Sequence, residues 1–558
     1  MKLNIKRTIN AKISSDQIID YLLKDRGISD KKIFFNPPHP TDIHFEDFFE
    51  DTSSFKKNRT NVLTLLNDIK KSGNAIVVYT DYDADGITGG AILWETLYLL
   101  GFNAMPYVPN RKTEGYGFSK KGIDAVKKQF NPALIISVDH GIVAHEQIAY
   151  AKSLGVPIII TDHHQKLDRK HDDAMAVFHT DKLSGSGVAY FFAKELYENF
   201  NPPAGGSNFK LLENNFSSDY LALASIGTIS DLVSLVGPAR SITKHGLAAF
   251  KKINRAGVNE LLKEAGIADR DITPYEVGFI IAPRINAFGR LGHALDALRL
   301  LCTKQEKRAY ELAQMAGETN RMRQELVEKA LKEAEQMVDT NKKLIIIYSQ
   351  NWEEGIIGLI ASRIAEKFYR PTIAMTKSDG FAKASARSVG TFDITAFLRS
   401  LKDYLVDVGG HKAAAGFTIE TKYISKFIKK SEEKAKSMLS DSDLVRHINV
   451  DAQIPLSVAT TKLAQNLEKL APFGIGNPKP LFYSQGKLIE ARLLGKKNDH
   501  LKIHIKDKDS FPLEVIFFNE GKKFADLSRG QKMSIVYNLA IDRWNEGEKL
   551  KGFGKLIL

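Results

Sequence analysis

The sequence predicts an α/β protein of several domains: a parallel-sheet domain, a long connecting helix, a smaller α/β domain and a C-terminal β-barrel. Three observations predict this fold. Short apolar runs that end in Asp or His alternate with helical segments in the first half, a charged helical stretch follows, and hydrophobic alternation dominates beyond residue 446. With 558 residues the chain is also too long for a single core.

The expected boundaries follow the changes of pattern. We predict a helical lead-in over 1–50, the parallel-sheet domain over 51–300, the connecting helix over 301–342, the second α/β domain over 343–440 and the barrel over 446–558.

Composition limits the class of protein. The only cysteine, Cys302, excludes a disulfide framework and a thiolate metal cluster. The N-terminus has no continuous apolar region, and no later stretch has 18 uncharged apolar residues. We therefore expect a protein that is neither exported nor membrane-spanning, and that works in the cytoplasm. A net charge of +13 favours a polyanionic partner, although a lysine-rich solvated surface explains it equally well.

The most informative stretch is 75–100. We predict a buried strand over 75–79, a tight turn over 86–90 and an apolar helix over 91–100. Asp81, Asp83 and Asp85 follow the strand at intervals of two, so in an extended chain their carboxylates project to one side. Three crowded acids repel one another unless a cation compensates, which favours a metal site over a solvated capping loop.

The next strands repeat this arrangement. A strand over 103–108 leads into a loop with Arg111 and Tyr116, which suits a phosphate or nucleotide but is equally compatible with a plain surface loop. Strands over 133–138 and 156–161 end in Asp139-His140 and Asp162-His163-His164. Because the carboxyl ends of parallel strands share one edge, we expect these side chains to meet there.

Further along, we predict helices over 184–199 and 219–229, with a Gly-, Pro- and Asn-rich loop over 201–217 between them. The second helix leads to Asp231, which serves either the acid site or, taken alone, as a helix cap. A Pro- and Gly-punctuated turn over 280–293 carries Arg284, Asn286 and Arg290.

The charge pattern over 307–339 predicts a solvated helix that connects two domains. Beyond it we predict strands over 343–348 and 372–376, a helix over 358–368, and a segment with Ser385 and Arg387. Gly409-Gly410-His411 at a turn would hold an anion, or form a bare turn.

The region beyond Arg446 predicts a small antiparallel barrel. It has 19 Lys or Arg against 12 Asp or Glu. A basic barrel with aromatic residues suits single-stranded nucleic acid, although most of these rings must belong to the core. The candidate rings are Phe482, Tyr483, Phe517, Phe518, Tyr537 and Trp544.

TDYDADG, SVDHG, TDHH and the later Ser-Asp, in this order, resemble the DHH phosphoesterase superfamily. With APRINAFGRL, ASARS, GGHKAAAGF and PFGIGNPKPLF, the resemblance covers roughly 50–558 and points to its single-strand-specific exonucleases. It implies a DHH catalytic domain, a connecting helix, a DHH-associated domain and an OB-fold. The implied activity is metal-dependent 5′ to 3′ hydrolysis of single-stranded DNA to 5′-mononucleotides, in recombination and repair. The implied partners are single-stranded DNA, a single-strand-binding protein and a RecQ-type helicase, and the implied state is a monomer.

The resemblance also implies roles for particular residues, with two divalent cations, Mn²⁺ or Mg²⁺, as cofactors. Asp139 would bridge the two ions, and many members place a His where Tyr79 stands here, so one ion would use Asp81 or bind more weakly. The implied metal ligands are Asp81, Asp83, Asp85, Asp139, His163 and Asp231; the catalytic residues are Asp85, Asp139 and His164; and the substrate-binding residues are Arg111, Tyr116, Arg284, Asn286, Ser385, Arg387 and His411.

Two other functions fit parts of the pattern. A small-substrate hydrolase of the same superfamily would have no need of a basic C-terminal barrel. A non-catalytic nucleic-acid scaffold would have lost the acids, whereas here the set of acids and histidines is nearly complete.

Overall fold

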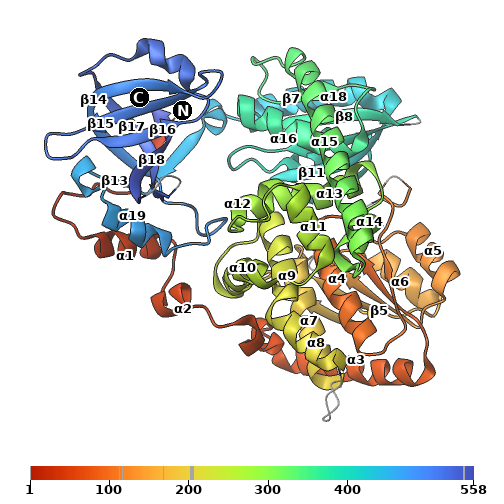
Figure 1. Cartoon of the computed structure of the whole chain (residues 1–558). Coiled ribbons are helices and arrows are strands. Elements are labelled where there is room, and N and C mark those ends of the chain that lie inside the picture. The colour runs from red at the N-terminus through yellow and green to blue at the C-terminus, as the bar shows by residue number, and fades with distance from the viewer. Residues whose placement is uncertain are drawn as a thin grey trace. The chain divides into compact units, whose positions relative to one another are not determined.

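The computed structural model describes residues 2–558 except 112, 116, 167–168, 201–206, 379 and 544–546. The chain forms two compact units (Figure 1). The first, the barrel unit, combines Met1–His44, Leu232–Ala248 and His447–Leu558; the second, the catalytic unit, combines Phe45–Asp231 and Ala249–Arg446. The chain therefore leaves the barrel unit and returns to it twice.

A five-stranded parallel sheet lies at the centre of the catalytic unit, as predicted. Its order is β3-β2-β4-β5-β6, and β2, β4 and β5 are buried at every position. Strands buried on both faces need apolar residues throughout, which explains their continuous Val and Ile runs. The strands are β2 (Ile76–Thr80), β3 (Ala104–Tyr107), β4 (Leu134–Val138), β5 (Ile158–Asp162) and β6 (Ala176–His179).

Helices cover both faces of this sheet. Side chains from α5 and α6 share one core with Val77 and Tyr79 of β2, while α4 packs against α7 and α9. The helices are α3 (Thr52–Ser72), α4 (Ala84–Leu99), α5 (Lys120–Phe130), α6 (His145–Ser153), α7 (Gly185–Phe200), α8 (Ser207–Ser217) and α9 (Asp219–Ser230).

Two sequence predictions in this domain were wrong. The turn predicted over 86–90 is the first part of α4, and its glycines allow close packing rather than a bend. A Cβ on Gly89 would lie 2.8 Å from Val138 Cγ1, and one on Gly90 would overlap Thr80. The loop predicted over 201–217 contains α8, since Leu212 and Phe216 are buried on one side of a helix; residues 201–206 lie outside the described part.

The turn predicted over 280–293 is also wrong, because this stretch is helical. A short helix α12 (Pro274–Glu276) continues as a π-helical turn η4 (Val277–Ile281) and then as α13 (Ala282–Leu291). Pro283 is tolerated near the start of α13, and Ile281, Ile285 and Phe288 form its buried stripe. Helix α13 packs against α14 (Leu295–Cys302) and the predicted long helix α15 (Glu306–Gln336), and α11 (Ala256–Glu264) packs against the same two helices. Helix α10 (Gly237–Ala249) falls almost entirely within the barrel unit.

A second five-stranded sheet, in the order β10-β11-β9-β8-β7, follows α15 in the catalytic unit. Only β7 and β8 pair in parallel. Gly409, Gly410 and His411 belong to β10 and pair with β11, so the predicted turn is wrong here too. The elements are β7 (Ile345–Tyr348), α16 (Ile357–Phe368), β8 (Thr372–Ser378), β9 (Phe381–Arg387), α17 (Ile394–Arg399), β10 (Leu405–His411), β11 (Ala414–Glu420) and α18 (Ile424–Met438).

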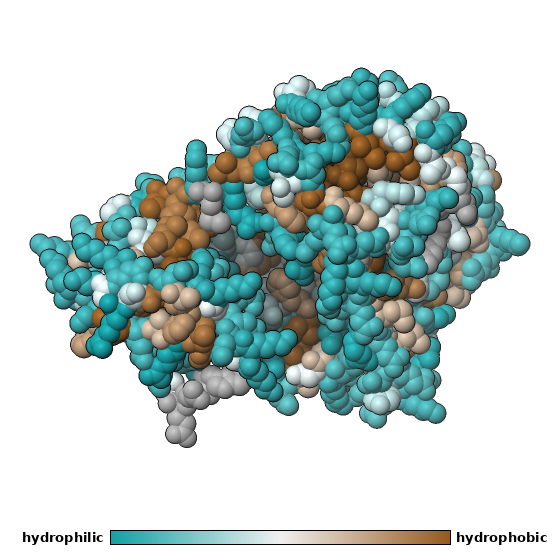
Figure 2. All heavy atoms as spheres, turned by 90° about the horizontal axis from the view of Figure 1, so that it is seen from above, coloured by the Kyte–Doolittle hydropathy of each residue, from teal (hydrophilic) through white to brown (hydrophobic). Residues whose placement is uncertain are grey.

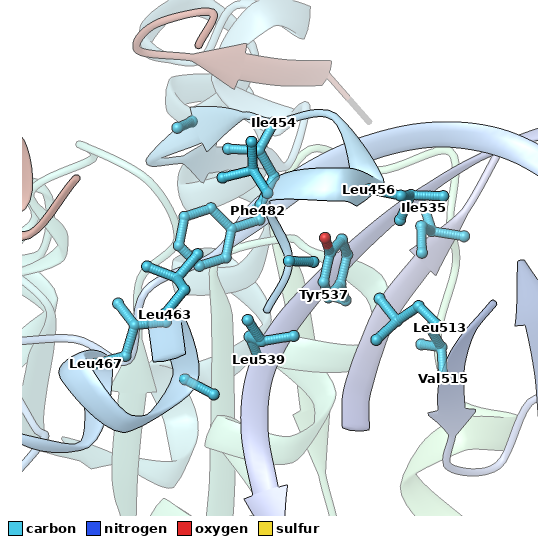
Figure 3. Close-up of a cluster of buried hydrophobic side chains, with 14 of the residues drawn as sticks. Ile454, Leu456, Leu463, Leu467, Phe482, Leu513, Val515, Ile535, Tyr537 and Leu539 are labelled. Atoms are coloured by element: carbon cyan, nitrogen blue, oxygen red, sulfur yellow. The ribbon is translucent and has the colours of Figure 1, made fainter. Parts of the chain in front are cut away.

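The predicted barrel is confirmed, except that it is not antiparallel throughout, because β16 and β18 pair in parallel. Its sheet has the order β13-β14-β15-β16-β18-β17, and β14 closes on β17. The core, part of which Figure 3 shows, includes Phe482, Val515 and Tyr537. The strands are β13 (Ala452–Gln453), β14 (Phe482–Leu494), β15 (His500–Lys506), β16 (Leu513–Phe517), β17 (Lys532–Asp542) and β18 (Lys549–Ile557).

The N-terminal segment belongs to the barrel unit and is more than a helical lead-in. Its first strand, β1 (Lys2–Ile5), pairs in parallel with β12 (His447–Val450). Helix α1 (Ser15–Asp25) packs against α19 (Thr461–Glu468), and α2 (Lys31–Phe35) follows. The buried guanidinium of Arg240 in α10 donates to the carbonyls of Phe34, Leu470 and Ala471, which ties the three chain segments of this unit together.

Hydrophilic residues cover most of the face in Figure 2, and hydrophobic ones gather there in separate patches. None of the helices in the described ranges is long and apolar enough to span a membrane.

Candidate active site

The acids lie at the point of the parallel sheet where the strand order reverses. From β2 the chain goes to β3 on one side, whereas β4 lies on the other side of β2. Asp81 follows β2 and Asp139 follows β4, so both lie at the carboxyl ends of the two strands that flank this switch point. Ligands of open α/β sheets bind at such a point.

Asp83 and Asp85 reach the same place through the start of α4. Asp83 caps the helix and accepts the N–H groups of Asp85 and Gly86 at 2.9 and 3.1 Å. Asp85 already lies in the first turn, so simple strand alternation does not describe it. Its two oxygens accept the N–H groups of Gly185 and Ser186 at 2.7 and 2.9 Å, at the start of α7. The positive end of that helix stabilises the carboxylate.

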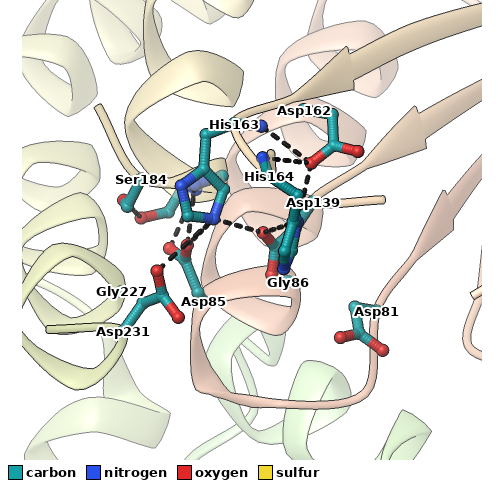
Figure 4. Close-up of polar contacts among 12 residues, drawn as sticks. Asp81, Asp85, Gly86, Asp139, Asp162, His163, His164, Ser184, Gly227 and Asp231 are labelled. Carbon is teal, nitrogen blue, oxygen red and sulfur yellow. Dashed lines mark hydrogen bonds and ion pairs between the residues drawn. The ribbon is translucent and has the colours of Figure 1, made fainter. Parts of the chain in front are cut away.

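His163 lies among the carboxylates (Figure 4). Its Nε2 is 3.1 Å from Asp139 Oδ1 and 3.4 Å from Asp231 Oδ2. Within the described residues, Asp139 Oδ1 and His163 Nε2 are buried and form no hydrogen bond. Asp139 also has a φ of +67°, an uncommon and strained value for a residue other than glycine. Buried, unsatisfied donors and acceptors on a strained backbone are typical of a site that holds a ligand.

Three groups of side chains have ligand atoms close enough to hold a metal ion. They are Asp81 with Asp83 and Asp139; Asp139 with His163 and His164; and Asp85 with His163 and Asp231. Burial first, and then the neighbouring charge of Asp83, raise the pKa of Asp81 well above its usual range. Burial and the charges of Asp85 and Asp83 likewise raise the pKa of Asp139. A cation would relieve this repulsion, and carboxylates with one or two imidazoles suit Mn²⁺ or Mg²⁺.

His164 is held beside this cluster by Asp162. Its Nδ1 lies 2.8 Å from Asp162 Oδ1, and its ring is stacked on that of His411 with 5.9 Å between centroids. Burial lowers the pKa of His164, but the hydrogen bond and charge of Asp162 outweigh it and raise the pKa to about 9. The sequence interpretation gave Asp162 no role, although its position before two histidines at a strand end was a usable signal.

Two proposed substrate residues, Ser385 and Arg387, lie at the end of β9, the central strand of the second sheet, and a third, Arg111, is close enough for its charge to act on Arg387. The Arg387 guanidinium donates to Ser385 Oγ at 2.9 Å and to Ser362 Oγ at 3.0 Å. Burial and then the charge of Arg111 lower the pKa of Arg387. Arg111 itself lies 5.2 Å from the centroid of the Tyr82 ring, next to the acids. Tyr116 lies outside the described residues.

The side chains of Arg284 and Asn286 form hydrogen bonds with other residues of the protein. Arg284 Nε donates to Glu264 at 2.7 Å, and Asn286 Oδ1 accepts the N–H of Ala84 at 2.7 Å. The sequence interpretation did not assign a role to Arg290. Its guanidinium donates to Gly355 O at 3.1 Å, and burial followed by the charges of Arg111 and Arg323 lowers its pKa to about 10.

Tyr79, for which the sequence resemblance left a metal-binding role in question, is a core residue. It is fully buried, its ring packs against Tyr107 and Phe118, and its hydroxyl lies 3.5 Å from Gly117 O. The side chain therefore lies in the core that β2 shares with α5 and α6.

In the barrel, most of the candidate rings serve the core. Phe482, Phe517 and Tyr537 are buried, while Phe518 is 56% exposed and lies parallel to Phe553 with 6.3 Å between centroids. Trp544 is outside the described residues. A cavity of about 800 Å³ in the same barrel is lined by five cations: Lys487, Lys506, Lys508, Arg529 and Lys532.

Comparisons with known proteins agree with this architecture. Family models match at 75–228 (DHH family, N-terminal domain), 341–437 (DHHA1 domain) and 450–552 (RecJ OB domain). The single-stranded-DNA-specific exonuclease RecJ of Thermus thermophilus is 32% identical over 488 residues, which are 86% of this chain and 68% of that protein. The chain belongs to the RecJ family.

A second RecJ protein and a crystal structure support the assignment. RecJ of Bacillus subtilis is 33% identical over 521 residues, and the match covers 92% of this chain but 64% of that protein. The crystal structure of RecJ in complex with Mn²⁺ from Thermus thermophilus superimposes with a TM-score of 0.82 at 28% identity, over 100% of this chain and 79% of that one. The RecJ fold thus extends over the whole chain, which spans about two thirds of the first two relatives.

Proposed function

We propose that this chain is a metal-dependent exonuclease that degrades single-stranded DNA from the 5′ end and releases 5′-mononucleotides, in recombination and repair in the cytoplasm. The observation that carries the proposal is the buried cluster of carboxylates and His163 at the switch point, with Arg111 and Arg387 nearby. RecJ relatives named as single-stranded-DNA-specific exonucleases support the substrate.

Two divalent cations, Mn²⁺ or Mg²⁺, are the proposed cofactors. Bound at the cluster, such ions would compensate the charge of a phosphodiester and would activate water. Asp139 and His163 each belong to two of the three ligand groups. Asp139 is the proposed bridging ligand, because a carboxylate has two oxygens that could serve two ions, whereas one imidazole nitrogen serves one. The full proposed ligand set is Asp81, Asp83, Asp85, Asp139, His163 and Asp231.

The remaining residues act on the DNA. His164, whose Nδ1 is held by Asp162 at 2.8 Å, donates to a phosphoryl oxygen of the scissile group. Arg111, Ser385 and Arg387 bind the 5′-terminal phosphate, because guanidinium groups pair well with a phosphate monoester. The cationic cavity and the Phe518 and Phe553 rings of the barrel bind the strand farther along. The protein acts as a monomer, and a single-strand-binding protein and a RecQ-type helicase supply its substrate.

A digestion of 5′-labelled and 3′-labelled single strands, with and without Mn²⁺, tests the proposal. We expect the 5′ label to appear first in mononucleotides, and only with metal. Asp139→Ala should lose cleavage by more than about 100-fold, because loss of even an outer partner of a ligand typically costs 10–100-fold. DNA binding should remain. Shortening from the 3′ end, or near wild-type cleavage by Asp139→Ala, would contradict the assignment.

A further inference from the structure

Two aromatic rings on the catalytic unit are exposed side by side. Tyr275 of α12 and Phe279 of η4 are 61% and 71% exposed, and their rings are stacked with centroids 5.0 Å apart at 29°. Single exposed aromatic residues are common on protein surfaces, but a stacked pair leaves two ring faces in water at a cost in free energy. A pair of this kind requires an explanation beyond folding.

The backbone under the pair is well anchored. Thr273 caps the helix in a reciprocal arrangement with Glu276, and Val277 and Ile281 on the opposite side are fully buried. The intervening turn is π-helical, which is rare and frequent at functional sites. The rings are therefore presented by an ordered element, so little conformational entropy would be lost when they bind a ligand.

This element lies against the end of α9 that leads to the acid cluster. A Cβ on Gly278 would lie 4.0 Å from Ile229, two residues before Asp231, and α9 packs against η4 (Figure 1). The Asp231 side chain is 33% exposed, whereas Asp85 and Asp139 are buried. The same run of helix continues into α13, which carries Asn286 and Arg290. The rings and the candidate active site thus share one continuous piece of structure.

The helical run that carries the pair also holds charged side chains of both signs, Glu276 in α12 and Arg284 in α13. Glu264 accepts hydrogen bonds from both Arg284 and Arg321, at 2.7 and 2.9 Å, so one carboxylate faces two guanidinium groups. Arg284 also donates to Ile280 O, the residue next to Phe279. A single nucleic-acid strand would offer its flat base rings to the aromatic pair.

We propose that Tyr275 and Phe279 form a stacking platform for the bases of the strand that extends from the acid cluster, on the side of Asp231. The inference rests on the proposed function, and it adds a binding site outside the phosphate pocket and the barrel. Every base has a flat face, so the platform would bind any sequence. Loss of one stacked base typically weakens single-strand binding by roughly fivefold to a hundredfold.

The test compares the full chain with the double variant Tyr275→Ala/Phe279→Ala. Affinity is measured by fluorescence anisotropy in an Asp139→Ala background, with a strand of about 20 nucleotides, which is longer than a single OB-fold usually covers. Cleavage is measured separately on this strand and on a 5′-phosphorylated dinucleotide. We expect a fivefold or greater loss of affinity and of kcat/KM for the long strand, and a much smaller effect on the dinucleotide. The single variant Tyr275→Phe, which keeps both rings, should retain most of the wild-type affinity for the long strand.

Tyr98→Ala provides the matched control. Tyr98 is 59% exposed and is stacked on Trp94 at 5.7 Å, but it lies at the end of α4 opposite Asp83 and Asp85. It should not change long-strand binding. Wild-type affinity in the double variant would overturn the platform while leaving the exonuclease proposal intact. A change in sedimentation without any change in DNA binding would show that the rings mediate self-association, and would also overturn it. Failure of the wild type to cleave any strand would reject the proposed function itself.

Discussion

Asn286 of α13 accepts a hydrogen bond of 2.7 Å from the N–H of Ala84, which stands between Asp83 and Asp85. This contact places an amide from a distant helix at the turn that orients two of the acids. The contact supports a role for Asn286 in positioning the acids, whereas the sequence resemblance implies a contact with the substrate.

Asn286→Ala should reduce kcat by about tenfold to a hundredfold, as loss of outer partners of metal ligands does. The KM for single-stranded DNA should change little, because the amide is occupied by the protein. Steady-state kinetics separate the two effects, and Asn67→Ala on the exposed face of α3 is the control. A variant with raised KM and unchanged kcat would favour direct substrate binding instead.

The crowded acids make the stability of the metal-free protein depend on pH. Burial and the charges of Asp85 and Asp83 raise the pKa of Asp231 to about 8. A raised pKa in the folded state means that this group contributes stability at pH values below about 4, and that the contribution is lost as the pH rises toward 8.

Thermal unfolding with a chelator should therefore show wild type losing stability relative to Asp231→Asn between about pH 4 and 8. With excess Mn²⁺ the trend should reverse, because cation binding requires deprotonated carboxylates. At a hundred times Kd, a bound cation would stabilise the folded state by about 2.7 kcal/mol. A pH-independent difference between the two proteins would argue against the raised pKa.

The start of α7 has no room for a side chain at Gly185. A Cβ at this position would overlap Asp139 Oδ1. Gly185→Ala should lower the melting temperature and abolish most of the Mn²⁺-induced rise in melting temperature, since the first N–H groups of α7 would no longer meet Asp85. Calorimetry with and without Mn²⁺ measures both. Gly278→Ala, where the nearest atom would be 4.0 Å away, should have neither effect.

Arg387 is proposed to bind the phosphate at the 5′ end of the DNA strand. A hydrogen bond from a charged donor contributes roughly 1.5–3 kcal/mol. Arg387→Ala should thus slow degradation of 5′-phosphorylated strands by about tenfold to a hundredfold. It should also reduce the ratio between the degradation rates of 5′-phosphorylated and 5′-hydroxyl strands. Paired time courses resolve this, with the exposed Arg308→Ala as control. Equal slowing of both substrates would exclude a terminal clamp.

The convergence of Asp81, Asp139 and His163 was predictable from the sequence, because parallel strands bring their carboxyl ends to one edge. The helical start at Ala84 was not, since Gly86 and Gly89 favour a turn when considered locally. Only packing against Val138 and Ser186 shows why glycine is required there. The partners of Arg284 and Asn286 are equally invisible in the sequence, because Glu264 and Ala84 are far away along the chain.

The pairing of β1 with β12 has a consequence for synthesis. Asn4 and Asn449 lie opposite each other although they are 445 residues apart. At roughly 5–20 residues per second, the first strand waits about 20–90 seconds on the ribosome before its partner exists. During that time the apolar side of α1, including Ile18, Leu22 and Leu23, has no barrel to cover it. The nascent chain therefore exposes an apolar helix surface until translation is almost finished. Such a surface is one to which a chaperone would bind.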